Sequence, residues 1–153
     1  MNEEELSIQL FKQASSEQGT EVLSWQGVDG KNYFARDIKF RLTSGERIEP
    51  DLIIRTSDQI WIIELKGSHA EALSDEVKLC HLKTHLGMDG IADQLKRHTS
   101  QPVNLSSIYL AVAYDANDPI SAACESSVVH ISWEALQDKI RKDGLAKTLI
   151  GLT

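Results

Sequence analysis

The chain has 153 residues, of which 41% are hydrophobic and 25% are charged. This is the usual size of one globular domain, so we expect residues 1–153 to form a single domain. No apolar run approaches the roughly 20 residues of a membrane span, and the first residues, Met1 to Glu5, are acidic where a signal peptide is basic. These features predict a cytoplasmic protein with no membrane partner.

The net charge of −7 counts against tight non-specific binding to nucleic acid, which depends on Lys and Arg side chains neutralising phosphates. Two arrangements would offset it: divalent cations held by carboxylates, or basic surface supplied by a partner subunit. The chain has only two cysteines, Cys80 and Cys124, too few for a disulfide framework, and we predict no bridge between them.

The first half of the chain predicts one helix and then three strands. Acids in the first turn and apolar positions at helical spacing indicate a helix over residues 3–18. Alternation of apolar and polar residues predicts a strand over 33–42, and a short strand follows over 51–55, opened by Pro50. Residues 60–66 are apolar on both faces until their end, which is typical of a central strand.

The second half predicts helices over 74–86 and 89–98, strands over 108–114 and 127–132, and a closing helix over 133–142. The resulting order, α-β-β-β-α-β-β-α, predicts an α/β fold in which three consecutive strands precede α/β crossover elements.

Two acids are expected to meet across the hairpin formed by residues 51–55 and 60–66. If the hairpin turns at Thr56 to Gln59, Asp51 falls directly opposite Glu64, with Cβ atoms about 4.5–5.5 Å apart. Like charges there are destabilising, and a divalent cation such as Mg²⁺ would compensate them. Lys66 shares the face of Glu64, whereas Leu65 points into the opposite layer.

Glu49-Pro50-Asp51 followed by Glu64-Leu65-Lys66 resembles the PD-(D/E)XK motif of restriction endonucleases, Holliday-junction resolvases and related nucleases. The resemblance implies a restriction endonuclease-like α-β-β-β-α-β core, a mixed central sheet flanked by helices, and a C-terminal β-α addition. It also implies that Asp51 and Glu64 bind Mg²⁺, with Mn²⁺ as a substitute, and that Lys66 assists the attacking water. By the same resemblance, Leu65 and Glu5 are candidate members of the metal shell.

Some branches of that superfamily also carry a Gln on the helix after the motif, often with Tyr four residues later. Gln94 matches this position and is a further candidate catalytic residue, but His98 stands where Tyr is expected. The alternative is that Gln94 and His98 are ordinary, partly buried polar residues that bond to the backbone.

Other interpretations remain open at this stage. Lys66 could form a cross-strand ion pair with Glu49, and Cys80, His81 and His85 could belong to a zinc site, although a fourth ligand is not evident. Four basic residues are either solvated helix positions or phosphate contacts: Lys78, Lys83, Lys96 and Arg97.

The sequence therefore predicts a metal-dependent nuclease that hydrolyses phosphodiester bonds in nucleic acid by attack of a Mg²⁺-activated water, and DNA is expected as the substrate more than RNA. A homodimer or a larger nucleoprotein complex is plausible. The alternative is a nuclease-fold module with weak or no catalysis that serves as a subunit of a larger defence, repair or mobile-element complex.

Overall fold

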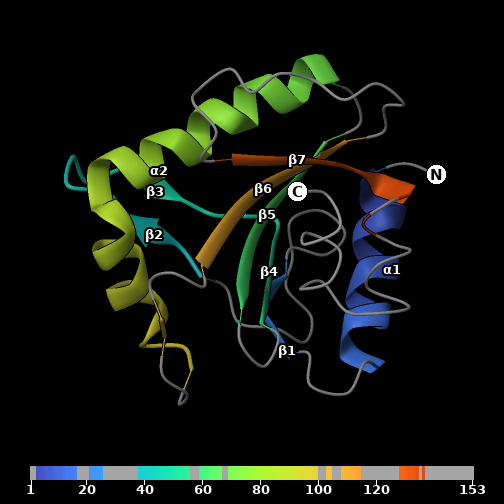
Figure 1. Ribbon diagram of the computed structural model, residues 1–153, viewed down its shortest axis with the longest axis horizontal. Helices are drawn as coiled ribbons and strands as arrows, with labels where there is room; N and C mark the ends of the chain where they lie inside the picture. The colour runs from blue at the N-terminus through green and yellow to red at the C-terminus, as the bar shows by residue number, and fades with distance from the viewer. Residues whose placement is uncertain are drawn as a thin grey trace.

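The computed structural model describes residues 3–16, 21–25, 38–55, 59–66, 69–99, 103–104, 108–114, 128–134 and 136. Over these residues the fold is α/β, with a five-stranded sheet, a separate two-stranded hairpin and two helices (Figure 1). Neither helix is both long and apolar enough for a membrane span.

The five-stranded sheet is mixed, as expected. Its strand order is β1 (Glu21–Trp25), β4 (Leu52–Arg55), β5 (Ile60–Lys66), β6 (Ile108–Tyr114) and β7 (Val128–Ser132). The first three strands in this order are antiparallel neighbours and the last three are parallel neighbours. The sheet therefore changes from antiparallel to parallel pairing at β5, which is buried along almost its whole length.

The two helices cover opposite faces of the sheet (Figure 1). α1 (Glu3–Ser16) packs Leu6 and Leu10 against one face, and α2 (His69–Leu95) packs an apolar stripe that includes Leu79 and Leu82 against the other. Successive side chains of β5 alternate between these layers: Ile60 and Ile62 lie in the α2 layer, and Trp61, Ile63 and Leu65 lie in the α1 layer.

A kink divides α2 into the two helical segments that the sequence predicted. Gly87 has φ 67° and ψ 168°, a backbone conformation that only glycine adopts readily, so the helix bends there. The first segment begins at His69 rather than at the predicted residue Ser74.

The separate hairpin consists of β2 (Phe40–Arg41) and β3 (Arg47–Ile48). It lies against the part of α2 that follows the kink (Figure 1). Phe40 and Ile48, which face each other across the hairpin, are buried in the α2 layer.

Three sequence predictions need correction. The strand predicted over 33–42 contributes Phe40–Arg41 to the separate hairpin, paired with the unpredicted strand β3, so β1 and not this strand is the neighbour of β4 in the central sheet. Strand β1 was not predicted, because a β-bulge between Val22 and Ser24 breaks the alternation on which the prediction relied and sends Leu23 and Trp25 to opposite faces. Cys80 is disulfide-bonded, which contradicts the expectation of free thiols. Cys124 lies outside the described residues, as do residues 33–37 of the strand predicted over 33–42 and residues 137–142 of the predicted closing helix.

Candidate metal centre

The pairing of β4 with β5 has the register that the sequence predicted. Ile53 pairs with Ile62 and Arg55 with Ile60, in an antiparallel ladder that ends at Leu52 and Ile63. One step beyond this last pair, Asp51 and Glu64 come together on the face of the sheet that α2 covers.

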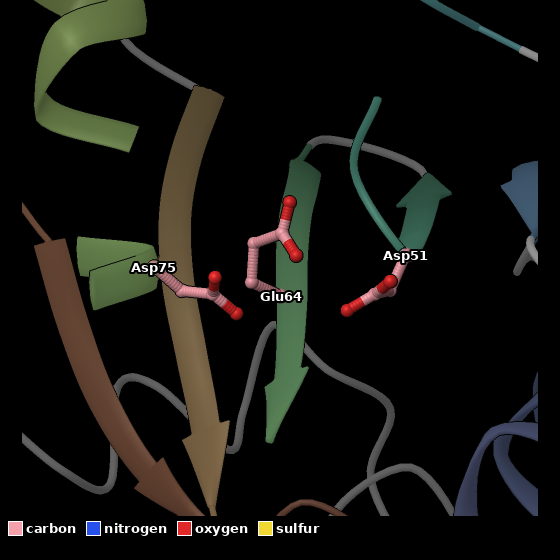
Figure 2. A group of neighbouring side chains, drawn as sticks. All are labelled: Asp51, Glu64 and Asp75. Atoms are coloured by element: carbon pink, nitrogen blue, oxygen red, sulfur yellow. The ribbon is translucent and has the colours of Figure 1, made fainter. Parts of the chain in front are cut away.

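A third acid, Asp75, joins them from the first segment of α2. Oxygen atoms of Asp51, Glu64 and Asp75 all lie within 4.8 Å of one another. Figure 2 shows the Glu64 carboxylate between the other two, each supplied by a different element of the fold. In the described part of the chain, these residues form the only group of three or more acids, histidines or cysteines that could hold a metal ion.

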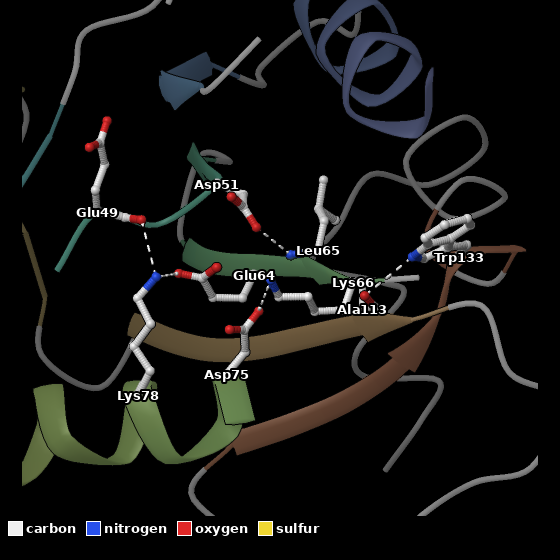
Figure 3. A network of polar contacts seen from close by, with 9 residues as sticks. All are labelled: Glu49, Asp51, Glu64, Leu65, Lys66, Asp75, Lys78, Ala113 and Trp133. Atoms are coloured by element: carbon white, nitrogen blue, oxygen red, sulfur yellow. Dashed lines mark hydrogen bonds and ion pairs between the residues drawn. The ribbon is translucent and has the colours of Figure 1, made fainter. Parts of the chain in front are cut away.

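A main-chain hydrogen bond fixes the carboxylate of Asp51. The Leu65 N–H lies beyond the last ladder pair of β4 and β5, and it donates to Asp51 Oδ2 at 2.8 Å (Figure 3). The side chain of Leu65 is buried in the opposite layer, as predicted. Leu65 therefore supports the acid cluster through its backbone.

Glu64 is the most deeply buried member of the cluster, with 2% of its side chain exposed. Burial raises the pKa of Glu64 well above its ordinary value, and the neighbouring charge of Asp51 raises it further. Lys78 acts in the opposite direction without cancelling these effects. A carboxylate in this position gains from any additional positive charge placed beside it.

Two lysines already supply positive charge to the cluster (Figure 3). Lys78 Nζ lies 2.8 Å from Glu64 Oε1 and also donates to the Glu49 carbonyl oxygen at 3.4 Å. Burial alone would lower the pKa of Lys78, but its attraction to Glu64, Asp75 and Asp51 outweighs burial, and the pKa is raised.

Lys66 lies on the face predicted for it, and its partner there is Asp75, with a nitrogen–oxygen distance of 3.9 Å. The alternative cross-strand pair with Glu49 is not the contact that forms. Glu49 instead lies 4.0 Å from Lys39.

Glu5 and Gln94 are placed away from this group. Glu5 is exposed on α1, the helix that packs on the other face of the sheet. The Gln94 amide makes two hydrogen bonds of 2.9 Å to the main chain of Arg41, accepting from its N–H and donating to its carbonyl. This is the backbone-bonded alternative foreseen for Gln94.

Asp75 and Lys78 were missed as site residues. The sequence places Asp75 only near the start of a predicted helix, and it predicts for Lys78 a solvated helix position or a phosphate contact. The available signal was their spacing: Asp75, Lys78, Leu79 and Leu82 follow the i, i+3, i+4, i+7 pattern of one helix face, and the two leucines mark that face as inward. Glu76, also buried on α2, lies 3.1 Å from His130 of β7.

The residues considered for zinc do not form a comparable group. His81 and His85 are exposed and stack with ring centroids 5.7 Å apart, and Cys80 is disulfide-bonded. Among the described residues, no third ligand joins the two histidines.

Comparisons of the chain with protein-family models, with curated proteins and with solved structures give no match. The chemistry of the carboxylate cluster therefore has to be argued from its own residues. Three carboxylates supply hard oxygen donors, the ligands that Mg²⁺ and Mn²⁺ prefer, so the donor set fits a divalent cation of this class.

Proposed function

We propose that the protein is a divalent-cation-dependent nuclease of the PD-(D/E)XK type that hydrolyses phosphodiester bonds, in DNA rather than RNA. One observation carries the proposal: Asp51 and Glu64 meet in the register required by the motif, and Asp75 completes a set of oxygen donors beside them. Lys66 shares their face. The restriction endonuclease-like core is part of this proposal.

In the proposed reaction, Asp51, Glu64 and Asp75 would hold one or two Mg²⁺ ions. When bound, Mg²⁺ supplies positive charge that polarises the phosphate and activates water for attack. The hydrogen bond from Leu65 orients Asp51, so the carboxylate does not have to be ordered when substrate arrives. The Lys66 ammonium exchanges its 3.9 Å contact with Asp75 for the attacking water or the developing phosphate charge.

A second function, a nuclease-fold module with weak or no catalysis, is favoured by a different observation. Lys78 already pairs with Glu64 at 2.8 Å and Lys66 with Asp75 at 3.9 Å, so two of the three acids have internal counter-ions. A module that relies on these ion pairs would need no metal. It would act through a partner in a larger complex.

The test combines cleavage with direct metal binding. Purified protein is incubated with linear, circular, single-stranded and branched DNA and with RNA, in Mg²⁺, in Mn²⁺ and in EDTA, and Mn²⁺ affinity is measured by calorimetry. Asp51→Asn and Lys66→Met are compared with matched controls on exposed positions of α2, Asp93→Asn and Lys83→Met. The nuclease proposal expects metal-dependent cleavage that only the site variants lose.

Cleavage that persists in Asp51→Asn, or that proceeds in EDTA, contradicts the proposed mechanism. No cleavage of any substrate, combined with no Mn²⁺ binding in the wild type, favours the module. A third outcome is that the wild type binds Mn²⁺, Asp51→Asn abolishes this binding, and no substrate is cleaved. The metal site is then real, and the substrate is not among the nucleic acids tested.

A further inference from the structure

Beyond the kink of α2, the chain forms a groove lined by positive charge. The groove has a volume of about 570 Å³ and lies between the β2–β3 hairpin and the end of α2. Its described lining residues include no Asp or Glu and four Lys or Arg side chains, together with one histidine: Lys39, Arg41, Arg47, Arg97 and His98. Such a concentration is unexpected in a chain with 23 acidic and only 16 Lys and Arg residues.

Two of these cations oppose each other across the hairpin. Arg41 and Arg47 are directly paired in the β2–β3 ladder, and both are exposed. The neighbouring pair, Phe40 and Ile48, is buried in the core, which fixes the arginines on the outward face. Like charges in directly opposed positions destabilise a hairpin, so this arrangement gains from an anion that binds between them.

Three cations of the groove, Arg41, Arg47 and Arg97, differ from those around the acid cluster. Lys66 and Lys78 each have a carboxylate partner. Among the residues that the structure describes, no carboxylate forms an ion pair with Arg41, Arg47 or Arg97. These three guanidinium groups are available to phosphate oxygens, which they can bind through two parallel N–H donors.

The hairpin is also held in position against α2. The two 2.9 Å hydrogen bonds between the Gln94 amide and the Arg41 main chain engage both backbone groups of that residue. The backbone that carries the Arg41 side chain is therefore already ordered, so binding of a ligand does not have to meet the entropic cost of ordering the hairpin.

A short chain of polar contacts links the lining of the groove to the acid cluster. Lys39, in the groove, lies 4.0 Å from Glu49, whose carbonyl accepts a hydrogen bond from Lys78 beside Glu64. From Lys78 to Leu86, which lines the groove, the helix rises about 12 Å. In a B-form strand, with about 3.4 Å between charges, that distance corresponds to roughly three or four nucleotide steps.

We propose that this cationic groove binds consecutive phosphates of the nucleic-acid strand whose scissile phosphate lies at Asp51, Glu64 and Asp75; the inference rests on the proposed nuclease function. A strand fits better than a single small anion, because the groove holds cations from several segments of the chain and polar contacts link its lining to the acids. Gln94 supports this surface by positioning Arg41.

The test is binding of a fluorescein-labelled oligodeoxynucleotide, single-stranded or duplex, measured by anisotropy at several salt concentrations in Ca²⁺. The groove variant Arg41→Gln/Arg47→Gln is compared with Lys12→Gln/Lys83→Gln, which removes the same charge from exposed helix positions outside the groove. Arg97→Gln, on α2, is an independent variant that leaves the hairpin unchanged. Melting temperatures verify that all variants are folded.

We expect the double groove variant to raise the Kd about tenfold and to reduce the salt slope by about 2, and Arg97→Gln to reduce it by about 1. The control variant should change the Kd less than twofold. Equal losses in groove and control variants, or no binding of either DNA form by the wild type, would overturn the proposal.

The cleavage assay in Mg²⁺ separates the two proposals. Binding that depends on the groove, without cleavage by the wild type, retains the groove and rejects the nuclease function. If the wild type cleaves DNA and the groove variants bind and cleave it as well as the wild type does, the nuclease function stands and the proposed role of the groove is rejected.

Discussion

Glu64 and Lys78 form an ion pair of 2.8 Å in which the carboxylate side chain is 2% exposed and the lysine side chain 35% exposed. The pair lies where a divalent cation would have to bind. Lys78 and a metal ion therefore compete for the same carboxylate, and this competition can be measured.

Lys78→Met is expected to destabilise the metal-free protein and to strengthen metal binding. Removing one partner leaves Glu64 without its closest cation, at a cost of about 2 kcal/mol because Lys78 is partly solvated. Thermal unfolding in EDTA and then in Mn²⁺ should show a lower Tm that the metal restores. Lys83→Met, at an exposed position of the same helix, is the control. A variant with unchanged Tm and unchanged Mn²⁺ affinity would contradict the competition.

Glu64→Gln is expected to be stabilised relative to the wild type as the pH rises. The folded state raises the pKa of Glu64, so the folded protein binds that proton more tightly than the unfolded chain. The stability that the folded protein gains from this proton is complete below the ordinary pKa of 4.5. It is lost as the pH rises through the folded-state pKa, at about 1.4 kcal/mol per pH unit.

Urea unfolding of wild type and Glu64→Gln across a pH series, without divalent ions, measures this difference. Asp93→Asn, at an exposed carboxylate on α2, should show a small and flat difference from the wild type. A flat difference for Glu64→Gln as well would show that the carboxylate is not perturbed. Added Mg²⁺ should reduce the pH dependence, because the metal favours the ionised form.

Gln94→Ala is expected to loosen the β2–β3 hairpin. It removes both hydrogen bonds to the Arg41 main chain and should cost about 1–2 kcal/mol. Hydrogen exchange at the Arg41 amide reports the effect directly. Gln94→Glu keeps the acceptor and loses the donor, so it should retain part of the protection, and Lys96→Ala should leave exchange unchanged. Protection that survives in Gln94→Ala would exclude the positioning role.

Gly87→Ala is expected to destabilise the protein by about 1–3 kcal/mol. The Cβ would meet no atom within 4 Å, so the cost comes from the backbone: φ 67° with ψ 168° is strained for any residue with a side chain. Thr84→Ala, at an exposed position in the same helix, should be neutral or slightly stabilising. Chemical denaturation measures both. A neutral Gly87→Ala would mean that the kink is not required.

The part of the site that the sequence predicted depends on local strand geometry. The bounds of β5 and its register with β4 follow from an apolar run, a short turn and the period of two, and these place Asp51 beside Glu64. The positions of Asp75 and Lys78 depend instead on how α2 is rotated against the sheet. The spacing of these residues with Leu79 and Leu82 marks an inward helix face, but which strand residues that face meets depends on contacts between α2 and the sheet, which no local pattern specifies.

Strand β1 is a second feature that the local sequence pattern does not predict. The bulge between Val22 and Ser24 breaks the alternation, so a five-residue strand carries no recognisable period. The sequence offered for Gln94 the alternative of a partly buried polar residue that bonds to the backbone. Its partner, the Arg41 backbone 53 residues away, could only be found once the hairpin was in place.

The sequence separations of two hydrogen-bonded pairs, one in the acid cluster and one in the groove, also bear on the order of folding. Asp51 and Leu65 are 14 residues apart, whereas Arg41 and Gln94 are 53 residues apart. Closing the longer loop costs about 1 kcal/mol more chain entropy, and non-local contacts form later for that reason. The acid cluster is therefore expected to assemble early from a contiguous stretch of chain, and the cationic groove to close late. A partly folded chain would then present its metal ligands before it could hold a nucleic-acid strand.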